Sequence, residues 1–284
     1  MPGLDQAYAP YCGAAPTAET LAIRWNLDPI LMAALLALAL AYGLGLARVA
    51  AADRPSPVER SCVLLGWALT ALALISPLCA LSVSLFSARV AQHMVLTLVA
   101  APLVAVGRPA EVLCSLWPDA AGAVRRSRLW RMVASAPGAT ALFALFLWFW
   151  HSPAPYAATF DGPWIYWAMH LSLYGSALLL WRVLLDPARA GVAQSLAAGA
   201  ISTLQMTFLG ALLTLSPRLL FTPHLFTTAD WGLSPLSDQQ IGGLIMWVPG
   251  CFVFLGVTLV TLARSMAGRV PGSVGRGAPS ESRS

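Results

Sequence analysis

The sequence predicts an all-α, polytopic membrane protein, a seven-helix transmembrane bundle with its N-terminus outside and its C-terminus in the cytoplasm. Of its 284 residues, 58% are hydrophobic and only 10% are charged, whereas soluble domains carry about 25% charged residues. The mean hydropathy is +0.71. Seven apolar segments approach or reach the roughly 20 residues that a helix needs to cross a bilayer. The distribution of arginine between the connecting segments predicts the orientation.

The transmembrane domain is expected over residues 29–263, between an outer N-terminal arm (1–28) and a disordered cytoplasmic tail (264–284) rich in Gly, Ser, Pro and Arg. The expected spans are residues 29–49, 62–85, 87–106, 139–151, 164–185, 193–216 and 240–263. The fourth is short and is expected to begin somewhat earlier. The arm lacks an early positive region, so the first apolar run is expected to be retained rather than cleaved as a signal peptide.

The basic residues are all arginines, and they alternate from side to side along the chain. Fourteen of the 17 follow the first, third, fifth and seventh spans, and only Arg24, Arg89 and Arg218 fall on the other side. Cytoplasmic segments of membrane proteins are enriched in Arg and Lys. The net charge of +5 therefore reflects membrane orientation rather than nucleic-acid binding. The segment 108–137 combines five arginines with tryptophans and is expected to lie on the anionic inner leaflet.

All four histidines fall on the predicted outer side. His93 lies about six residues, or roughly 9 Å, below the outer end of the third span, and His170 lies at a similar depth in the fifth. His151 closes the outer end of the fourth span, and His224 lies in the last outer loop. Ionisable residues inside a membrane are costly, so several at one level predict a functional site. Equal depth does not establish lateral proximity.

Sulfur-containing residues add to this pattern. Met246 and Met206 lie in stripes of small residues that should point into the bundle. Histidine together with thioether, without paired cysteines, favours copper over structural zinc. The five cysteines contain no CxxC pair and are interpreted as small apolar filler; they are Cys12, Cys62, Cys79, Cys114 and Cys251.

Simpler interpretations stay open for each residue. His93 and His170 could form hydrogen bonds between helices, His151 could belong to an interfacial aromatic belt, and both methionines could serve packing. His224, in a loop, is expected to be structural or incidental. Arg89 could pair with a carboxylate such as Asp238, or it could extend to the outer headgroups.

Four motifs resemble the multi-spanning CtaG family of cytochrome c oxidase assembly factors. They are Gln92-His93-Met94-Val95-Leu96 continuing to Ala101-Pro102-Leu103 and Gly107; Trp150-His151-Ser152-Pro153 with Tyr156; His170 with Gly175 and Trp181; and the string from Asp238 to Gly250, DQQIGGLIMWVPG. The similarity covers roughly residues 29–263.

This resemblance implies a multi-pass protein of the bacterial inner (plasma) membrane that helps to mature a haem–copper oxidase by helping copper to reach it. The residues that match are His93, His151, His170, Asp238, Gln239 and Met246. The first three and Met246 would bind copper, and Asp238 and Gln239 would orient a ring nitrogen or attract cations. Oxidase subunits, the lipid bilayer and periplasmic copper carriers are the partners implied.

Two other classes of function stay open at this stage. A haem-binding electron carrier would use His93 and His170 as opposed axial ligands. A scaffold or transporter without metal would use the histidines to join helices or to relay protons. No nucleophile–base spacing and no phosphate-binding loop stands out in the sequence, so no enzyme activity is expected.

Overall fold

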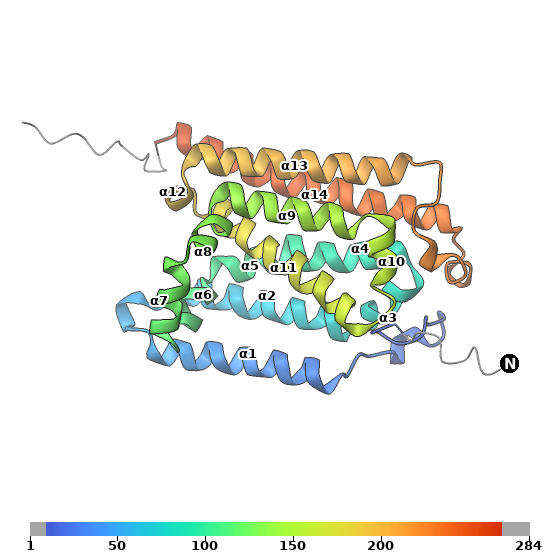
Figure 1. Ribbon diagram of the computed structural model, residues 1–284, viewed down its shortest axis with the longest axis horizontal. Coiled ribbons are helices and arrows are strands. Elements are labelled where there is room, and N and C mark those ends of the chain that lie inside the picture. Colours follow the sequence, from blue (N-terminus) through green and yellow to red (C-terminus); the bar gives the residue numbers. More distant parts are fainter. Residues whose placement is uncertain (1–9, 269–284) are drawn as a thin grey trace, which may run out of the picture.

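The computed structural model describes residues 10–268, and over this range the chain is helical, without a strand. The long helices run side by side, with α1 at one edge of the bundle and α13 and α14 at the other (Figure 1). The long helices are α1 (Pro29–Arg48), α2 (Pro57–Ile75), α9 (Ala136–Trp150), α11 (Pro163–Leu185), α13 (Val192–Leu215) and α14 (Pro235–Met266). A broken helix, which consists of α4 (Phe86–Met94), the π-helical η4 (Val95–Ala100) and α5 (Ala101–Val106), runs through the middle.

Six helices are long and apolar enough to cross a membrane, with the broken helix counted as one over Phe86–Val106. α9 is apolar but has only 15 residues. Large apolar side chains face outward along these helices, and Leu36, Leu204 and Phe252 are more than 60% exposed. In a soluble protein such a surface would be unfavourable, whereas lipid accepts it. The chain is therefore a multi-pass membrane protein.

Several boundaries differ from the expected ones, and α2 and α14 each begin five residues earlier, at Pro57 and Pro235. The second expected span is not continuous, because α2 ends at Ile75 and α3 (Pro77–Ser84) begins after Ser76. Pro77 has no backbone N–H with which to continue the helix, and the Ser76 hydroxyl caps the new one by accepting from Leu78 N–H at 3.4 Å. α14 continues to Met266, three residues beyond the expected end of the last span. The expected disordered tail lies mostly in 269–284, outside the described residues.

The broken helix occupies the centre because it contacts α2, α3, α11 and α14. Pro102 explains the break, since it cannot donate to the carbonyl four residues earlier and its ring crowds that turn. The preceding residues open into the π-helix η4, which begins two residues after His93. Trp181 of α11 fixes this turn, because its indole N–H donates to the carbonyl of Thr97 at 2.6 Å.

The small-residue stripes of α13 and α14 point into the bundle, as the sequence predicts, and they pack against each other. An added Cβ at Gly210 would lie 2.6 Å from Cβ of Trp247, and one at Gly243 would lie 2.8 Å from the carbonyl of Gly210. Backbones approach this closely only where side chains are absent. Met206 packs against Gly250 and is fully buried.

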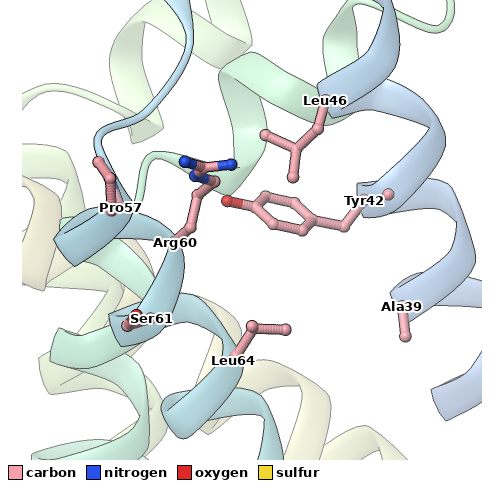
Figure 2. Close-up of a pocket in the computed structure, with 8 residues that line it drawn as sticks. Ala39, Tyr42, Leu46, Pro57, Arg60, Ser61 and Leu64 are labelled. Atoms are coloured by element: carbon pink, nitrogen blue, oxygen red, sulfur yellow. The ribbon is translucent and has the colours of Figure 1, made fainter.

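The end of the bundle away from the N-terminal arm carries three short helices, α6 (Pro109–Cys114), α7 (Pro118–Arg126) and α8 (Arg128–Val133). Trp117, Leu129 and Met132 are at least 60% exposed there, as the predicted interfacial segment requires. Near this end, a cavity of about 420 Å³ lies between α1 and α2, with Tyr42 and Arg60 on its walls (Figure 2). The histidines do not line it.

Candidate functional site

Three of the four histidines converge from three helices. His93 lies on α4, His170 lies on α11, and His151 directly follows α9. The ring centroid of His93 is 5.1 Å from that of His170 and 6.2 Å from that of His151. All three side chains are buried. The structure thus adds the lateral proximity that the sequence left open.

Two of these rings are oriented by the backbone of their own helix. Nδ1–H of His170 donates to the carbonyl of Tyr166 at 3.0 Å, and Nδ1–H of His151 donates to the carbonyl of Leu147 at 2.7 Å. A carbonyl can only accept, so Nδ1 carries the proton and Nε2 of the neutral ring keeps its lone pair. Nε2 of His170 is buried without a partner. Metal-binding histidines are commonly held in this way.

His93 differs because neither of its ring nitrogens has a hydrogen-bond partner, although both are buried. Leaving one buried polar group unpaired costs about 1–3 kcal/mol. The ring of His93 neighbours those of His151 and His170, and Nε2 of His170 is free to accept or to bind a cation. An orphaned group in such surroundings indicates a site that receives a proton or a ligand.

The shortness of α9 follows from its role in this cluster. A helix of 15 residues is about 22 Å long, which is less than the roughly 30 Å hydrocarbon core. Its C-terminal end therefore stops inside the bundle, at the level of His93, and the chain turns at His151 into α10 (Pro153–Ala158). Pro153 prevents the helix from continuing.

A buried cation lies one helical turn before His93. The guanidinium of Arg89 is 4.0 Å from the ring centroid of Phe160, and it donates to the Thr159 hydroxyl at 2.6 Å. Its Nε has no partner, and the side chain is 1% exposed. Arg89 thus neither pairs with Asp238 nor extends to the surface, contrary to both expectations. Aromatic faces stabilise the guanidinium in place of a carboxylate.

His224 is structural, as the sequence predicts. Its Nδ1–H donates to the carbonyl of Val83 at 3.1 Å, and its Nε2 accepts from the Tyr156 hydroxyl at 2.7 Å. Both ring nitrogens are therefore occupied. Burial, together with the nearby charge of Arg89, lowers the pKa of His224 to about 3. The neutral ring fastens the last loop to α3 and α10.

Asp238 and Gln239 hold backbone groups rather than histidines. Asp238 accepts from the backbone N–H groups of Phe86 and Ser87, at 2.6 and 3.1 Å, and from the Ser87 hydroxyl. Gln239 accepts from Leu220 N–H at 2.7 Å and donates to the carbonyl of Arg218 at 3.1 Å. Within the described range, neither forms a hydrogen bond to a histidine. Asp238 thereby positions the first turn of α4, and Gln239 holds the loop that follows α13.

Met246 is fully buried and belongs to the same apolar cluster as Val90 and Met94. It lies one turn beyond Gly242, where an added Cβ would meet the ring of Phe86 at 2.5 Å. This places Met246 beside α4. Its role as a ligand stays a prediction.

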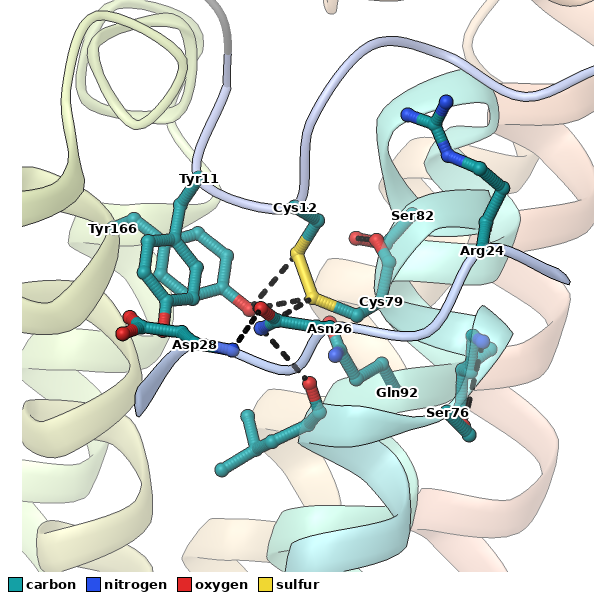
Figure 3. Close-up of a disulfide and its surroundings, with 12 residues drawn as sticks. Tyr11, Cys12, Arg24, Asn26, Asp28, Ser76, Cys79, Ser82, Gln92 and Tyr166 are labelled. Atoms are coloured by element: carbon teal, nitrogen blue, oxygen red, sulfur yellow. Dashed lines mark hydrogen bonds between the residues drawn. A yellow bond between two sulfur atoms is a disulfide. The ribbon is translucent and has the colours of Figure 1, made fainter. Parts of the chain in front are cut away.

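Two cysteines are joined in a disulfide, which the sequence analysis did not anticipate. Cys12 of the arm is bonded to Cys79 of α3, with their Cα atoms 5.6 Å apart (Figure 3). The interpretation as apolar filler is wrong for these two, whereas Cys62, Cys114 and Cys251 are free. Both partners fall on the predicted outer side, where disulfides persist. That shared side was the signal that could have identified the pair.

The disulfide fixes the arm over the histidine cluster. The Tyr11 ring stacks on that of Tyr166 at 4.7 Å, and the Tyr166 ring lies 4.1 Å from the imidazole of His170. The Tyr166 hydroxyl is 3.4 Å from Sγ of Cys12 and 3.6 Å from Sγ of Cys79. The Tyr11 hydroxyl donates to Asp28 at 2.5 Å and lowers the pKa of that carboxyl. One tyrosine therefore separates the disulfide from the cluster.

In residues 10–268, no group of three or more His, Cys, Asp or Glu side chains is close enough to hold a metal ion as the side chains now stand. A pair of imidazoles is a different case. A metal–imidazole bond is about 2 Å long, so two rings on one ion have centroids up to about 6 Å apart. The 5.1 Å between His93 and His170 fits this limit.

Fold and cluster together define a multi-pass membrane protein with a buried set of histidines near one end of its helices. The sequence profile described as "Cytochrome c oxidase caa3 assembly factor (Caa3_CtaG)" matches residues 40–267. This range covers most of the chain, so the protein belongs to the CtaG family of cytochrome c oxidase assembly factors, as its motifs indicated. Searches of curated proteins and of solved structures find no significant match.

Proposed function

We propose that the protein binds Cu(I) between His93 and His170 and passes it to a subunit of a haem–copper oxidase during assembly. The observation that carries this proposal is the set of free ring nitrogens, both of His93 and Nε2 of His170, buried and facing no other partner. Imidazole suits copper, and a site with few ligands and no thiolate can release the ion again. His151 and Met246 would serve as exchanging ligands.

We place the site on the outer face of a bacterial plasma membrane. The disulfide between Cys12 and Cys79 supports this side, because disulfides persist in the oxidising periplasm. The arginine distribution supports the same orientation. The N-terminal arm would then lie outside and the C-terminus inside, with α9 as a seventh, shortened crossing. Copper would arrive from a periplasmic carrier and leave sideways to the oxidase.

The spacing of the rings favours copper over haem. Opposed axial imidazoles hold the haem iron at about 2 Å each, which sets their centroids roughly 6 Å apart with the macrocycle between them. His93 and His170 are closer, at 5.1 Å, and their planes are inclined by 68°. Haem would require both helices to move apart.

Elemental analysis of the purified protein tests the proposal. The full chain is prepared without a chelating tag, loaded anaerobically with Cu(I), and compared with the His93→Ala, His170→Ala double variant. Wild type is expected to retain about one copper per chain and the double variant far less. Ser202→Ala is the matched control, since it removes another buried, unpaired polar group without touching the cluster.

The same variants are then expressed in cells that depend on the oxidase. The double histidine variant is expected to lower the copper content of the oxidase while its subunits still insert into the membrane. Equal copper in wild type and in a folded double variant would refute the site. Copper binding that is lost without any effect on the oxidase would refute the delivery role. A scaffold without metal predicts no copper in either protein.

A further inference from the structure

We propose a second copper site, formed by Cys12 and Cys79 when their disulfide is reduced, at the mouth of the histidine cluster. Its ligand would be Cu(I) bound between two thiolates. It would receive the ion outside the bundle and pass it past Tyr166 to His170. The inference deepens the proposed function and rests on it for the second step, but the cysteine site itself can be tested separately.

The two sulfurs would stay close together after reduction, because other contacts hold the arm. Ser84 donates its hydroxyl to the carbonyl of Pro16 at 3.1 Å, and the backbone N–H and side-chain amide of Asn26 donate to the carbonyls of Ile75 and Leu74 at 2.8 and 3.2 Å. Tyr11 remains stacked on Tyr166. The Cα atoms of the two cysteines, now 5.6 Å apart, need little movement for both sulfurs to reach one ion. Soft thiolates select Cu(I).

The surroundings of the sulfurs favour negative charge on them. The side-chain amide of Asn26 lies 3.6 Å from Sγ of Cys79, and the Tyr166 hydroxyl lies near both sulfurs. A disulfide has no S–H, so the Asn26 amide and the Tyr166 hydroxyl are the donors. Figure 3 shows these contacts. The same donors would stabilise thiolates, because hydrogen bonds to a charged form favour it.

The disulfide is also accessible from one side. Cys79 is 1% exposed, whereas Cys12 is partly exposed at the surface of the arm. Attack by an external thiolate requires access to a sulfur, and Cys12 offers it. The tyrosine then links the two sites, since its hydroxyl contacts both sulfurs and its ring lies on His170.

The chemistry balances with a dithiol protein as reductant. Its thiolate attacks Sγ of Cys12, the bond between the two sulfurs breaks, and Cys79 leaves as a thiolate. The second thiol of the reductant then displaces Cys12, and the reductant ends as a disulfide after giving two electrons. Cu(I) replaces the protons that the two thiols would otherwise hold. On transfer, two Cu–S bonds are exchanged for Cu–N bonds, the sulfurs regain protons, and copper stays Cu(I).

The test compares oxidised and reduced full-length protein in lipid nanodiscs. The disulfide is reduced after purification, so that folding is not affected, and excess reductant is removed without oxygen. Cu(I) is titrated against a chromophoric Cu(I) chelator, and copper X-ray absorption reports on sulfur ligands. Reduction is expected to add about one copper per chain with sulfur ligands. Cu(I) should also protect Cys12 and Cys79 from alkylation.

Variants identify the residues that bind the extra copper. The Cys12→Ser, Cys79→Ser variant should lose it. A Cys62→Ser, Cys114→Ser, Cys251→Ser control should keep it, since those cysteines are free and lie elsewhere. The His93→Ala, His170→Ala variant should keep the sulfur-bound copper and lose the other. No extra copper on reducing the control would overturn the inference. If wild type binds the sulfur-ligated copper on reduction but no copper at the histidines, only the proposed function is refuted.

Discussion

Asp238 caps a helix to which it is not joined. Its carboxylate accepts from the first backbone N–H groups of α4, including that of Ser87 at 3.1 Å, although α4 has no capping side chain of its own. A carboxylate at a helix N-terminus both satisfies the unpaired donors and complements the positive end of the helix dipole. α14 thereby sets the position of α4, and through it the height of His93.

Asp238→Ala should lower stability strongly, because it leaves two backbone donors and the Ser87 hydroxyl unpaired. We expect a loss of about 3 kcal/mol, seen as a lower apparent Tm in detergent. Asp238→Asn, which keeps one acceptor oxygen, should lose less. Asp230→Ala, an exposed carboxylate in the neighbouring loop, should change stability by less than about 0.5 kcal/mol. Equal Tm values for Asp238→Ala and Asp230→Ala would contradict the capping role.

Arg89→Gln should strengthen Cu(I) binding by about tenfold, because it removes a buried positive charge one turn from His93. The control is Arg218→Gln, whose side chain is exposed on a loop at the same end and should leave the affinity unchanged. Competition with a chromophoric chelator measures both. Unchanged or weaker binding by a folded Arg89→Gln protein would mean that the cation serves packing, not the site.

Much of this molecule could be predicted from its sequence, because membrane helices show their length and apolarity directly. The depth of His93 and His170 followed from counting residues along two spans. The features that could not be predicted depend on how each helix is oriented about its axis and on contacts between residues that are distant in the chain. The distance between the rings, the cap that Asp238 provides and the bond between Cys12 and Cys79, 67 residues apart, all depend on packing that no local pattern encodes.

The two predictions for the Arg89 side chain were wrong for a more specific reason. A charge near a membrane surface usually finds a carboxylate or the headgroups, and both expectations followed that rule. Instead, the guanidinium of Arg89 lies on the ring face of Phe160 and donates to the hydroxyl of Thr159. These two side chains belong to a distant segment, and the spacing of residues in the sequence does not predict that they meet Arg89.

Gly210→Ala should destabilise the pair α13 and α14, since its Cβ would lie 2.6 Å from Cβ of Trp247 and 2.8 Å from backbone. The helices would have to separate, at a cost of about 1–3 kcal/mol. Gly256→Ala on α14 is the matched control, because a Cβ there meets nothing within 4 Å, and it should be neutral or slightly stabilising. Thermal unfolding of both variants in the same detergent provides the comparison, and a similar Tm for both would contradict the close approach.

His224 should make stability depend on pH in a defined direction. Its pKa is about 3 in the folded protein against 6.5 for the free side chain, so below pH 6.5 the unfolded chain binds a proton that the folded chain does not. Stability should therefore fall as the pH is lowered from 6.5 toward 3, by up to about 1.4 kcal/mol per pH unit. The contribution is full above pH 6.5.

Replacing the ring isolates this contribution from the other histidines, which remain in both proteins. His224→Gln should be less stable than wild type at pH 7.5, because the bonds to Val83 and Tyr156 are lost or weakened, but the difference should shrink as the pH falls to 4.5. Tyr156→Phe, which keeps the titrating ring, should retain the slope of wild type. Apparent Tm values across this range measure all three proteins. Parallel plots of apparent Tm against pH for wild type and His224→Gln would contradict the prediction. They would show that the pKa of His224 does not differ between the folded and unfolded states.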